Sequence, residues 1–251
     1  MKFSIFVATH KKFEFPLPDN YIPILVGSYK FDLSIYQRDD DGEFQISYKN
    51  KNYCELTGLY WIWKNIRTDY VGLCHYRRYF INKKNALVDE RDIKMDLSRY
   101  DIILPKKYYY LQNNYSNYKK RHHIKDLDLC RDIIEEICPE YIRSFDRVMG
   151  RNYLYLYNMF VCKKELIDEY CNWLFSIFDV LETKIDLENY DDYQSRVYGF
   201  LSERLFNVWI DHKQLKIKED VVMKIDAKKS EVFVAKIKNE IKKYSFILKW
   251  H

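Results

Sequence analysis

Residues 50–80 read NKNYCELTGLYWIWKNIRTDYVGLCHYRRYF, and this stretch decides the fold. Its first half has apolar side chains at three- and four-residue steps, which predicts a helix over Tyr53–Ile66. Its second half is a short apolar run, which predicts a buried strand over Tyr70–Tyr76. A helix followed directly by a buried strand is typical of an α/β domain.

The rest of the chain repeats this alternation of strands and helices. Sequential α/β units favour a mostly parallel central sheet flanked by helices, so we expect a single α/β domain. Residues 12–50 and 106–123 lack a clear period and predict irregular segments. The other predicted strands are Lys2–Ala8, Tyr100–Leu104 and Tyr153–Cys162, and the other predicted helices are Asp126–Ile137, Pro139–Met149, Lys164–Leu181 and Val197–Ile210.

Composition limits the class of protein. A chain of 251 residues with 47% hydrophobic residues and only six glycines can bury a sizeable core, which excludes a disordered or collagen-like protein. None of the six cysteines forms a C-x-x-C pair, so we expect buried thiols of a reducing cytoplasm rather than a zinc site or disulfides. The sequence has no signal-peptide pattern and no apolar run long enough to cross a membrane, which predicts a soluble cytoplasmic protein.

Positive charge is concentrated towards the C-terminus. The formal net charge is +5, but residues 213–251 hold eleven lysines against five acidic residues, which leaves −1 for residues 1–212. This division predicts a domain over 1–212 and a basic extension over 213–251, and it argues against a nucleic-acid partner. A helix in the extension would either pack on the domain or hold the protein at an anionic membrane surface. That amphipathic helix is predicted from the spacing of Val234, Ile237, Ile241, Tyr244 and Leu248 among lysines.

Cationic residues occupy the end of the predicted strand Tyr70–Tyr76. Alternation along the strand places His75 and Arg77 on one side and Arg78 on the other. Ligands of open α/β sheets bind beyond the carboxyl ends of the strands. Because guanidinium groups can hold phosphate oxygens bidentately, the cluster predicts a phosphate or diphosphate site. The alternative is that the arginines are ion-paired to the acidic loops.

Motifs for other phosphate and hydrolytic chemistry are missing. The chain has no GxxxxGK[ST], GxGxxG, HExxH or GxSxG pattern, which argues against ATP-driven, dinucleotide, zinc-protease and serine-hydrolase chemistry. Two further positions carry polar groups that could face a ligand. Asn158 stands in a strand-like segment, where its amide could bind sugar hydroxyls. Glu203 shares a helix face with Arg196, either as a structural ion pair or as a carboxylate that faces the cleft.

Taken together, these segments resemble a bacterial family of glycosyltransferases of capsular polysaccharide and exopolysaccharide biosynthesis. The resemblance covers roughly residues 3–210 and implies a GT-A-like fold that binds a nucleotide sugar. It does not fix the donor sugar, although galactose in either ring form fits the family. The matching blocks are Ala8–Lys11, Glu55–Asn65, Tyr70–Phe80, Asn158–Phe160 and Arg196–Leu205.

The resemblance also implies a reaction. A hexosyl group, galactose-type by preference, would pass from a UDP-sugar to a hydroxyl of a surface-polysaccharide acceptor, which could be lipid-linked at the inner face of the cell membrane. The alternative is a non-catalytic protein of the same assembly that binds a nucleotide sugar or a carbohydrate and needs no positioned base. In the transferase, Glu203, Asp191 and His75 are the candidates for catalysis, and an inverting enzyme needs one such group to deprotonate the acceptor hydroxyl. Nucleotide and diphosphate would contact Thr9, His10, Lys11, His75, Arg77 and Arg78, and the sugar would contact Asn158, Met159 and Trp61.

Metal use is a separate question. In many GT-A enzymes the strand before the donor site ends in D-x-D, whose carboxylates hold a divalent metal against the diphosphate. Here the comparable strand end reads His75-Tyr76-Arg77, so the resemblance implies that cationic side chains replace the ion and that no metal is required. The competing site is the turn at residues 39–41, where Asp39 and Asp41 could bind Mn²⁺ or Mg²⁺.

Overall fold

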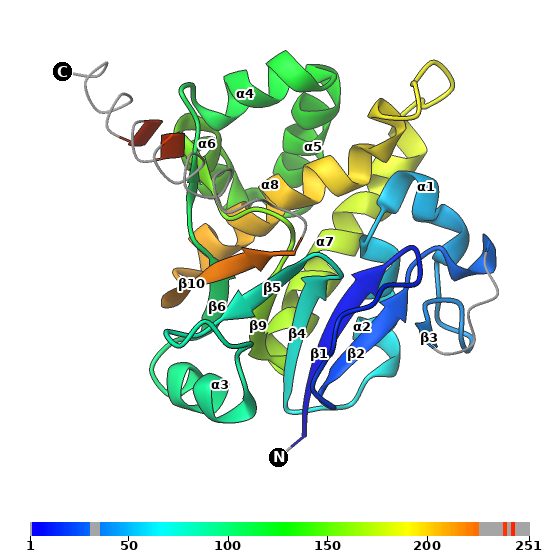
Figure 1. The fold of residues 1–251 in the computed structure, drawn as a ribbon. Coiled ribbons are helices and arrows are strands. Elements are labelled where there is room, and N and C mark those ends of the chain that lie inside the picture. The colour runs from blue at the N-terminus through cyan, green and yellow to red at the C-terminus, as the bar shows by residue number, and fades with distance from the viewer. Residues whose placement is uncertain (1, 31–35, 226–237, 240–241, 244–251) are drawn as a thin grey trace.

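The computed structural model describes residues 2–30, 36–225, 238–239 and 242–243. An eight-stranded sheet forms the centre of this part of the chain, in the order β3-β2-β1-β4-β5-β10-β6-β9 (Figure 1). Its strands are β1 (Phe3–Thr9), β2 (Tyr21–Leu25), β3 (Gln37–Arg38), β4 (Tyr70–His75), β5 (Arg78–Ile81), β6 (Ile102–Pro105), β9 (Phe160–Lys163) and β10 (Ile217–Lys224). A separate two-stranded sheet pairs β7 (Tyr108–Tyr109) with β8 (Tyr153–Leu154).

The α/β class is confirmed, but the expectation of a mostly parallel sheet is wrong. Strands β3, β2, β1 and β4 run parallel to one another, and so do β10 and β6. Strand β5 is antiparallel to β4 and β10, and β9 is antiparallel to β4 and β6. Only two residues link β4 to β5, a connection that permits antiparallel pairing alone. The sheet is therefore mixed.

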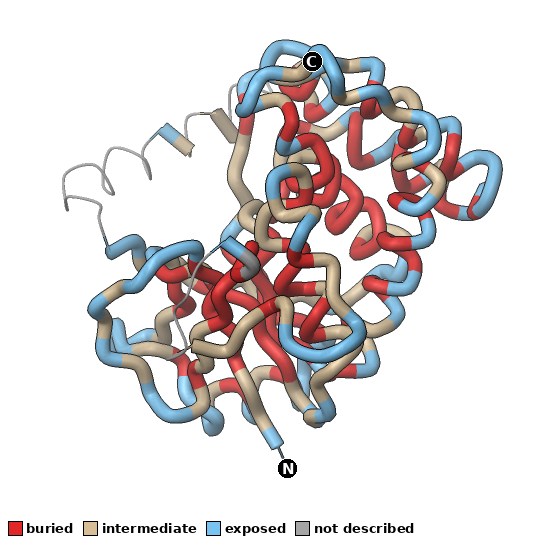
Figure 2. The backbone as a smooth tube through the Cα atoms, turned by 90° about the vertical axis from the view of Figure 1, so that its right-hand side faces the viewer, coloured by how far each residue is buried: buried red, intermediate tan, exposed pale blue. Residues whose placement is uncertain are grey.

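Helices cover both faces of the sheet, and alternation along the strands divides the core between them. In β1, Ile5 and Val7 face the core that includes α3, whereas Phe6 and Ala8 face the larger core beneath α2, α7 and α8. Figure 2 shows the buried segments running through the strands and along the inner sides of the helices. The helices are α1 (Asn50–Tyr53), α2 (Leu56–Asn65), α3 (Glu90–Leu97), α4 (Asn114–Arg121), α5 (Ile124–Ile137), α6 (Ile142–Gly150), α7 (Lys164–Lys184) and α8 (Val197–Lys213).

The helix predicted over Tyr53–Ile66 is interrupted. Cys54 has φ 53° and ψ −130°, so α1 ends before it and α2 begins at Leu56. A non-glycine residue with this backbone conformation is uncommon, and nothing in the sequence indicates it. The interruption matters for the site because it lies at Cys54 and Glu55.

Other predicted segments also differ from the structure, and residues 12–50, predicted as irregular, contain β2 and β3. The strand predicted over Tyr153–Cys162 is two short strands, β8 and β9, separated by residues 155–159, in which Tyr157 and Asn158 have left-handed φ values of 76° and 50°. The segment predicted as a loop over 106–123 contains α4, which begins after Asn113, whose side chain accepts a hydrogen bond from the Ser116 amide at 2.8 Å. A side chain that caps the first turn in this way stabilises a helix that has little apolar periodicity.

Strand β10 lies inside the sheet, between β5 and β6. The boundary predicted at residue 212 therefore does not coincide with the end of the folded unit. Of the amphipathic helix predicted in the extension, Val234, Ile237, Ile241, Tyr244 and Leu248 lie outside the described residues. Within them, the side chain of Asn239 accepts a hydrogen bond from the Tyr109 amide at 2.7 Å and donates one to the Lys107 carbonyl at 3.0 Å. Among the described helices, none has the length and apolar character needed to cross a bilayer.

Candidate active site

A cavity of about 640 Å³ opens beyond the carboxyl ends of β1 and β4. These strands are parallel neighbours, and their register places Ala8 opposite His75, so the two strand ends meet at one edge of the sheet. This is the position at which open α/β sheets bind ligands. The polar residues that line the cavity are Thr9, His10, Asn50, Lys51, Cys54, Glu55, His75, Tyr76, Arg77, Arg78, Tyr157, Asp192, Arg196 and Glu203.

The arginines after β4 line this cavity. The guanidinium of Arg78 lies over the ring of Tyr157, 4.5 Å from its centroid, and that of Arg77 lies 4.9 Å from the centroid of Tyr76. Buried Nε of Arg78 has no hydrogen-bond partner among the described residues, and no described carboxylate forms an ion pair with this side chain. The alternative, in which the arginines are ion-paired to acidic loops, therefore does not hold for Arg78 within the described residues.

The backbone of Tyr157 joins two functional groups of the cavity. Its amide donates a hydrogen bond to Glu203 Oε1 at 2.9 Å, and its carbonyl lies 2.6 Å from His75 Nε2. Since a carbonyl can only accept, Nε2 of His75 carries a proton and Nδ1 is the nitrogen left for other partners. Left-handed φ values at Tyr157 and Asn158 allow this arrangement, and backbone conformations of this kind are found where function requires them.

Asn158 positions a carboxylate and does not line the cavity. Its side chain is buried, with 4% exposure, and its Nδ2 donates to Glu55 Oε1 at 2.8 Å and to Ser202 Oγ at 2.9 Å. The predicted contact of Asn158 with a sugar is therefore replaced by contact with Glu55, which does line the cavity. Ser202 Oγ donates in turn to the Gly199 carbonyl, so the Asn158 amide is held through Nδ2, while its Oδ1 has no hydrogen-bond partner among the described residues.

Glu203 faces the cavity with 23% of its side chain exposed. Its partner is Arg204, whose Nη1 lies 3.3 Å from Oε2, and not Arg196, whose Nε lies 3.1 Å from the sulfur of Cys54. Burial raises the pKa of Glu203 above its usual value, the charge of Glu55 raises it further, and Arg204 and the Tyr157 amide oppose this shift. Burial also raises the pKa of the Cys54 thiol to about 11, which disfavours the reactive thiolate near neutral pH.

The residues after β1 form a turn at the cavity wall. Thr9 is buried, and its hydroxyl donates to the Lys11 carbonyl at 2.6 Å and accepts from the Lys11 amide at 3.2 Å. His10 lies edge-on to the Tyr76 ring, and partial burial together with the charges of Lys11 and Arg77 lowers the pKa of His10. The imidazole of His10 is therefore neutral near pH 7. Of these three predicted residues, Thr9 and His10 line the cavity and Lys11 does not.

Three further predicted residues, namely Trp61, Met159 and Asp191, do not line the cavity. Trp61 is in the core against Phe6 and donates its Nε1 to the Asp41 carbonyl at 2.8 Å. Met159 is fully buried in the core on the α3 side of the sheet. Asp191 uses its carboxylate to accept from the Gln194 amide at 2.6 Å, and its neighbour Asp192 lines the cavity instead.

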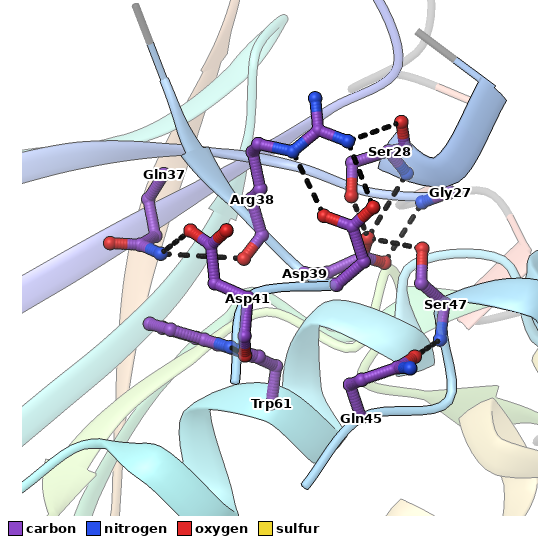
Figure 3. Close-up of polar contacts among 10 residues, drawn as sticks. Gly27, Ser28, Gln37, Arg38, Asp39, Asp41, Gln45, Ser47 and Trp61 are labelled. Atoms are coloured by element: carbon purple, nitrogen blue, oxygen red, sulfur yellow. Dashed lines mark hydrogen bonds and ion pairs between the residues drawn. The ribbon is translucent and has the colours of Figure 1, made fainter. Parts of the chain in front are cut away.

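Asp39 is a buried hydrogen-bond centre (Figure 3). Its carboxylate is fully buried and accepts hydrogen bonds from the amides of Gly27 and Ser28 and from the hydroxyls of Ser28, Ser47 and Thr57. With five donors around two oxygens, little room is left for a cation. Asp41 is exposed and accepts from Gln37 Nε2 at 2.7 Å. No cluster of three or more metal-ligating side chains occurs in the described part of the chain.

The chain matches one protein family and one solved structure. The family model described as "Domain of unknown function (DUF4422)" matches residues 4–214. Among solved structures, the chain is similar to the apo structure of the WbbM bifunctional glycosyltransferase, with a TM-score of 0.82 and 33% sequence identity over 90% of this chain and 46% of that one. The chain thus spans less than half the length of that protein. None of the curated proteins that were compared matches it.

Proposed function

This chain belongs to the DUF4422 family, and from that premise we propose that it is a glycosyltransferase. The family match and the similarity to a bifunctional glycosyltransferase confirm the resemblance seen in the motifs. Because the chain corresponds to less than half of that protein, the support for an activity of its own comes from its cavity. The observation that carries the proposal is the cluster of His75, Arg77 and Arg78 beside a cavity that also contains carboxylates.

The reaction is the transfer of a hexosyl group, with galactose preferred, from a UDP-sugar to a hydroxyl of a surface-polysaccharide acceptor. In this reaction the bond between the sugar C1 and the diphosphate oxygen breaks, and negative charge develops on the leaving diphosphate. Cationic side chains fixed at that position stabilise the charge as it forms. Arg78 suits this role because its Nε is buried without a partner and its guanidinium is fixed over Tyr157.

The nucleotide occupies the part of the cavity beside β1. The neutral imidazole of His10 lines that wall and can hydrogen-bond a base or a ribose hydroxyl, while Thr9 holds the turn that carries His10. With the nucleotide in this position, the sugar and the acceptor lie on the side of the cavity that Glu55 and Glu203 line.

Transfer without a divalent metal is part of the proposal. Guanidinium groups can balance the diphosphate charge directly, and Asp39, the first residue of the competing acidic turn, already has its carboxylate oxygens engaged by protein donors. The proposed acceptor is a glycan. If that glycan is linked to a lipid, the protein works in the cytoplasm at the inner face of the cell membrane.

The test is release of the nucleoside diphosphate from a panel of UDP-hexoses, measured with and without glycan acceptors and with EDTA. We expect release that depends on acceptor, favours a galactose donor and survives EDTA. Arg78→Ala should lower the rate about 10²–10³-fold, as loss of one charge-stabilising donor does elsewhere. Arg91→Ala, which removes an exposed arginine of α3, should leave the rate unchanged.

Three outcomes would contradict this function. Tight binding of UDP-sugars with no release of UDP would favour the non-catalytic binding protein. Activity abolished by EDTA and restored by Mn²⁺ would refute metal independence. Equal rates for Arg78→Ala and Arg91→Ala would remove Arg78 from the diphosphate site.

A further inference from the structure

We propose that Glu55 is the general base that takes the proton from the acceptor hydroxyl. The assignment rests on the proposed transferase function and adds a catalytic residue to it. Three carboxylates line the cavity, namely those of Glu55, Asp192 and Glu203. They differ in how each is held and in which of its oxygen atoms remains available.

Asp192 and Glu203 fit the role poorly. The side chain of Asp192 is 97% exposed, and its contact with Lys51 is 3.5 Å long, so nothing fixes its orientation. Glu203 is fixed, but each of its oxygens already has a partner, since Oε1 accepts from the Tyr157 amide and Oε2 faces Arg204. These contacts make Glu203 an anchor for the left-handed segment at Tyr157.

Glu55 combines a fixed orientation with an available oxygen. Oε1 accepts from the buried Asn158 amide at 2.8 Å, and no described residue donates a hydrogen bond to Oε2. The amide cannot swing away, because the same Nδ2 also donates to Ser202 Oγ at 2.9 Å. A carboxylate held through one oxygen presents the other at a defined position, which general-base catalysis requires.

The backbone on both sides of the hydrogen bond between Glu55 and Asn158 supports this geometry. The interruption at Cys54 separates α1 from α2, so Glu55 stands at the cap of α2 and not in the middle of a continuous helix. Asn158 itself has a left-handed φ of 50°. The hydrogen bond thus joins Asn158, which has an unusual conformation, to the residue that directly follows Cys54, which has another, as is common where a catalytic group is positioned.

The chemical step balances within the proposed reaction. The acceptor hydroxyl gives its proton to Glu55 Oε2 while its oxygen forms the new bond to the sugar C1. The bond from C1 to the diphosphate oxygen breaks, and its electron pair leaves with UDP towards Arg77 and Arg78. Direct displacement of this kind inverts the configuration at C1. The proton on Glu55 then passes to solvent.

The experiment compares two nucleophiles on the same donor, a glycan hydroxyl and the azide ion. Azide carries no proton, so it needs no base. We expect Glu55→Gln to slow transfer to the glycan about 10²–10⁴-fold, to keep the donor KM within about twofold, and to form glycosyl azide at the wild-type rate. Glu55→Asp should recover part of the transfer activity. Asn158→Ala, in which the carboxylate loses its support, should lower kcat for the glycan with an unchanged rate to azide.

The matched control is Glu203→Gln, which should slow both reactions to the same degree because Glu203 anchors Tyr157. The assignment is overturned if Glu55→Gln transfers to the glycan normally, if a folded Glu55→Gln loses both reactions together, or if the product keeps the donor configuration. It is also overturned if Glu203→Gln or His75→Gln loses only the glycan reaction. A wild-type protein that forms neither product overturns the transferase function itself, which is a different result from any of these.

Discussion

At the scale of single residues, Asp39 shows how a buried carboxylate can organise a loop. Its neighbours in sequence suggest a metal-binding turn, yet its oxygens accept from two backbone amides and three hydroxyls contributed by three separate segments. A buried charge is tolerated when it is fully hydrogen-bonded, and here the hydrogen bonds join the end of β2, the segment before α1, and α2.

Asp39→Ala should therefore destabilise the protein strongly. The substitution removes the acceptor that five buried donors share, and we expect it to lower the free energy of unfolding by about 3 kcal/mol or more. The measurement is the midpoint of urea unfolding. Asp41→Ala, which removes one exposed hydrogen bond to Gln37, should stay within about 0.5 kcal/mol of the wild type. Similar midpoints for the two variants would show that Asp39 is not the centre of the loop.

The site residues divide into those that sequence can reveal and those that it cannot. His75, Arg77 and Arg78 could be predicted, because a cationic run after an apolar strand has a clear physical meaning. Glu55 and Tyr157 could not be assigned, because their placement depends on left-handed backbone at Cys54, Tyr157 and Asn158. Glycine would have marked such positions, but none of these residues is glycine.

At the scale of elements, β4 is the strand that delivers the cationic cluster, and Gly72 lets its neighbours approach closely. Gly72 pairs with Ile5 of β1 on one side and with Val161 of β9 on the other. A methyl group at this position would lie 3.0 Å from Val161 Cγ2, 3.1 Å from Ile5 Cγ1 and 3.2 Å from the Phe160 carbonyl oxygen. Since one of these atoms belongs to the backbone, the crowding cannot be relieved by side chains alone.

Gly72→Ala should cost about 1–3 kcal/mol of stability and should also reduce activity, because the end of β4 must shift with the strand. Thermal unfolding and UDP release measure the two effects. Gly150→Ala, at the end of α6, is the matched control, since a methyl group there meets no atom within 4 Å. The explanation fails if the two alanine variants are equally stable and equally active.

Element predictions succeeded where apolar runs were clear and failed where strands were short or mixed in composition. Strands β1, β4 and β6 and helices α5, α7 and α8 lie within or close to their predicted ranges. Strand β10 has the sequence IKEDVVMK, and only one of its eight residues is buried. Because four of its residues are charged, it has no apolar run from which a strand could be predicted. Strand β5 begins with Arg78, and a charged residue at the start of a four-residue segment does not indicate a strand.

At the scale of the whole molecule, β10 decides where the folded unit ends. It supplies a partner to β5 on one side and to β6 on the other, at Val221–Lys224 and Ile217–Asp220 respectively. Neither the charge boundary at 212 nor the family match to 214 includes it. The sheet is mixed because β5 and β9 run antiparallel to β4. The sequence alone did not predict these two reversals of direction.

A chain that ends at residue 214 should therefore fail to fold cooperatively, because β5 and β6 both lose their common neighbour. Near-UV circular dichroism and calorimetry would detect the loss. A chain that ends at residue 225 keeps β10 and should retain a single unfolding transition, although it lacks the contacts of Asn239 with Lys107 and Tyr109. A cooperative transition in the shorter chain would show that β10 is dispensable.

The place of β10 also affects how the protein is made. It begins 112 residues after β6 ends, so at roughly 5–20 residues per second a ribosome needs about 6–22 s to supply it. During that interval the facing edges of β5 and β6 lie unpaired in the nascent chain, and unpaired edges can template contacts with other chains on the same polysome. Translation speed across the 111 codons between β6 and β10, and the supply of chaperones that bind extended segments, should therefore govern the yield of soluble protein.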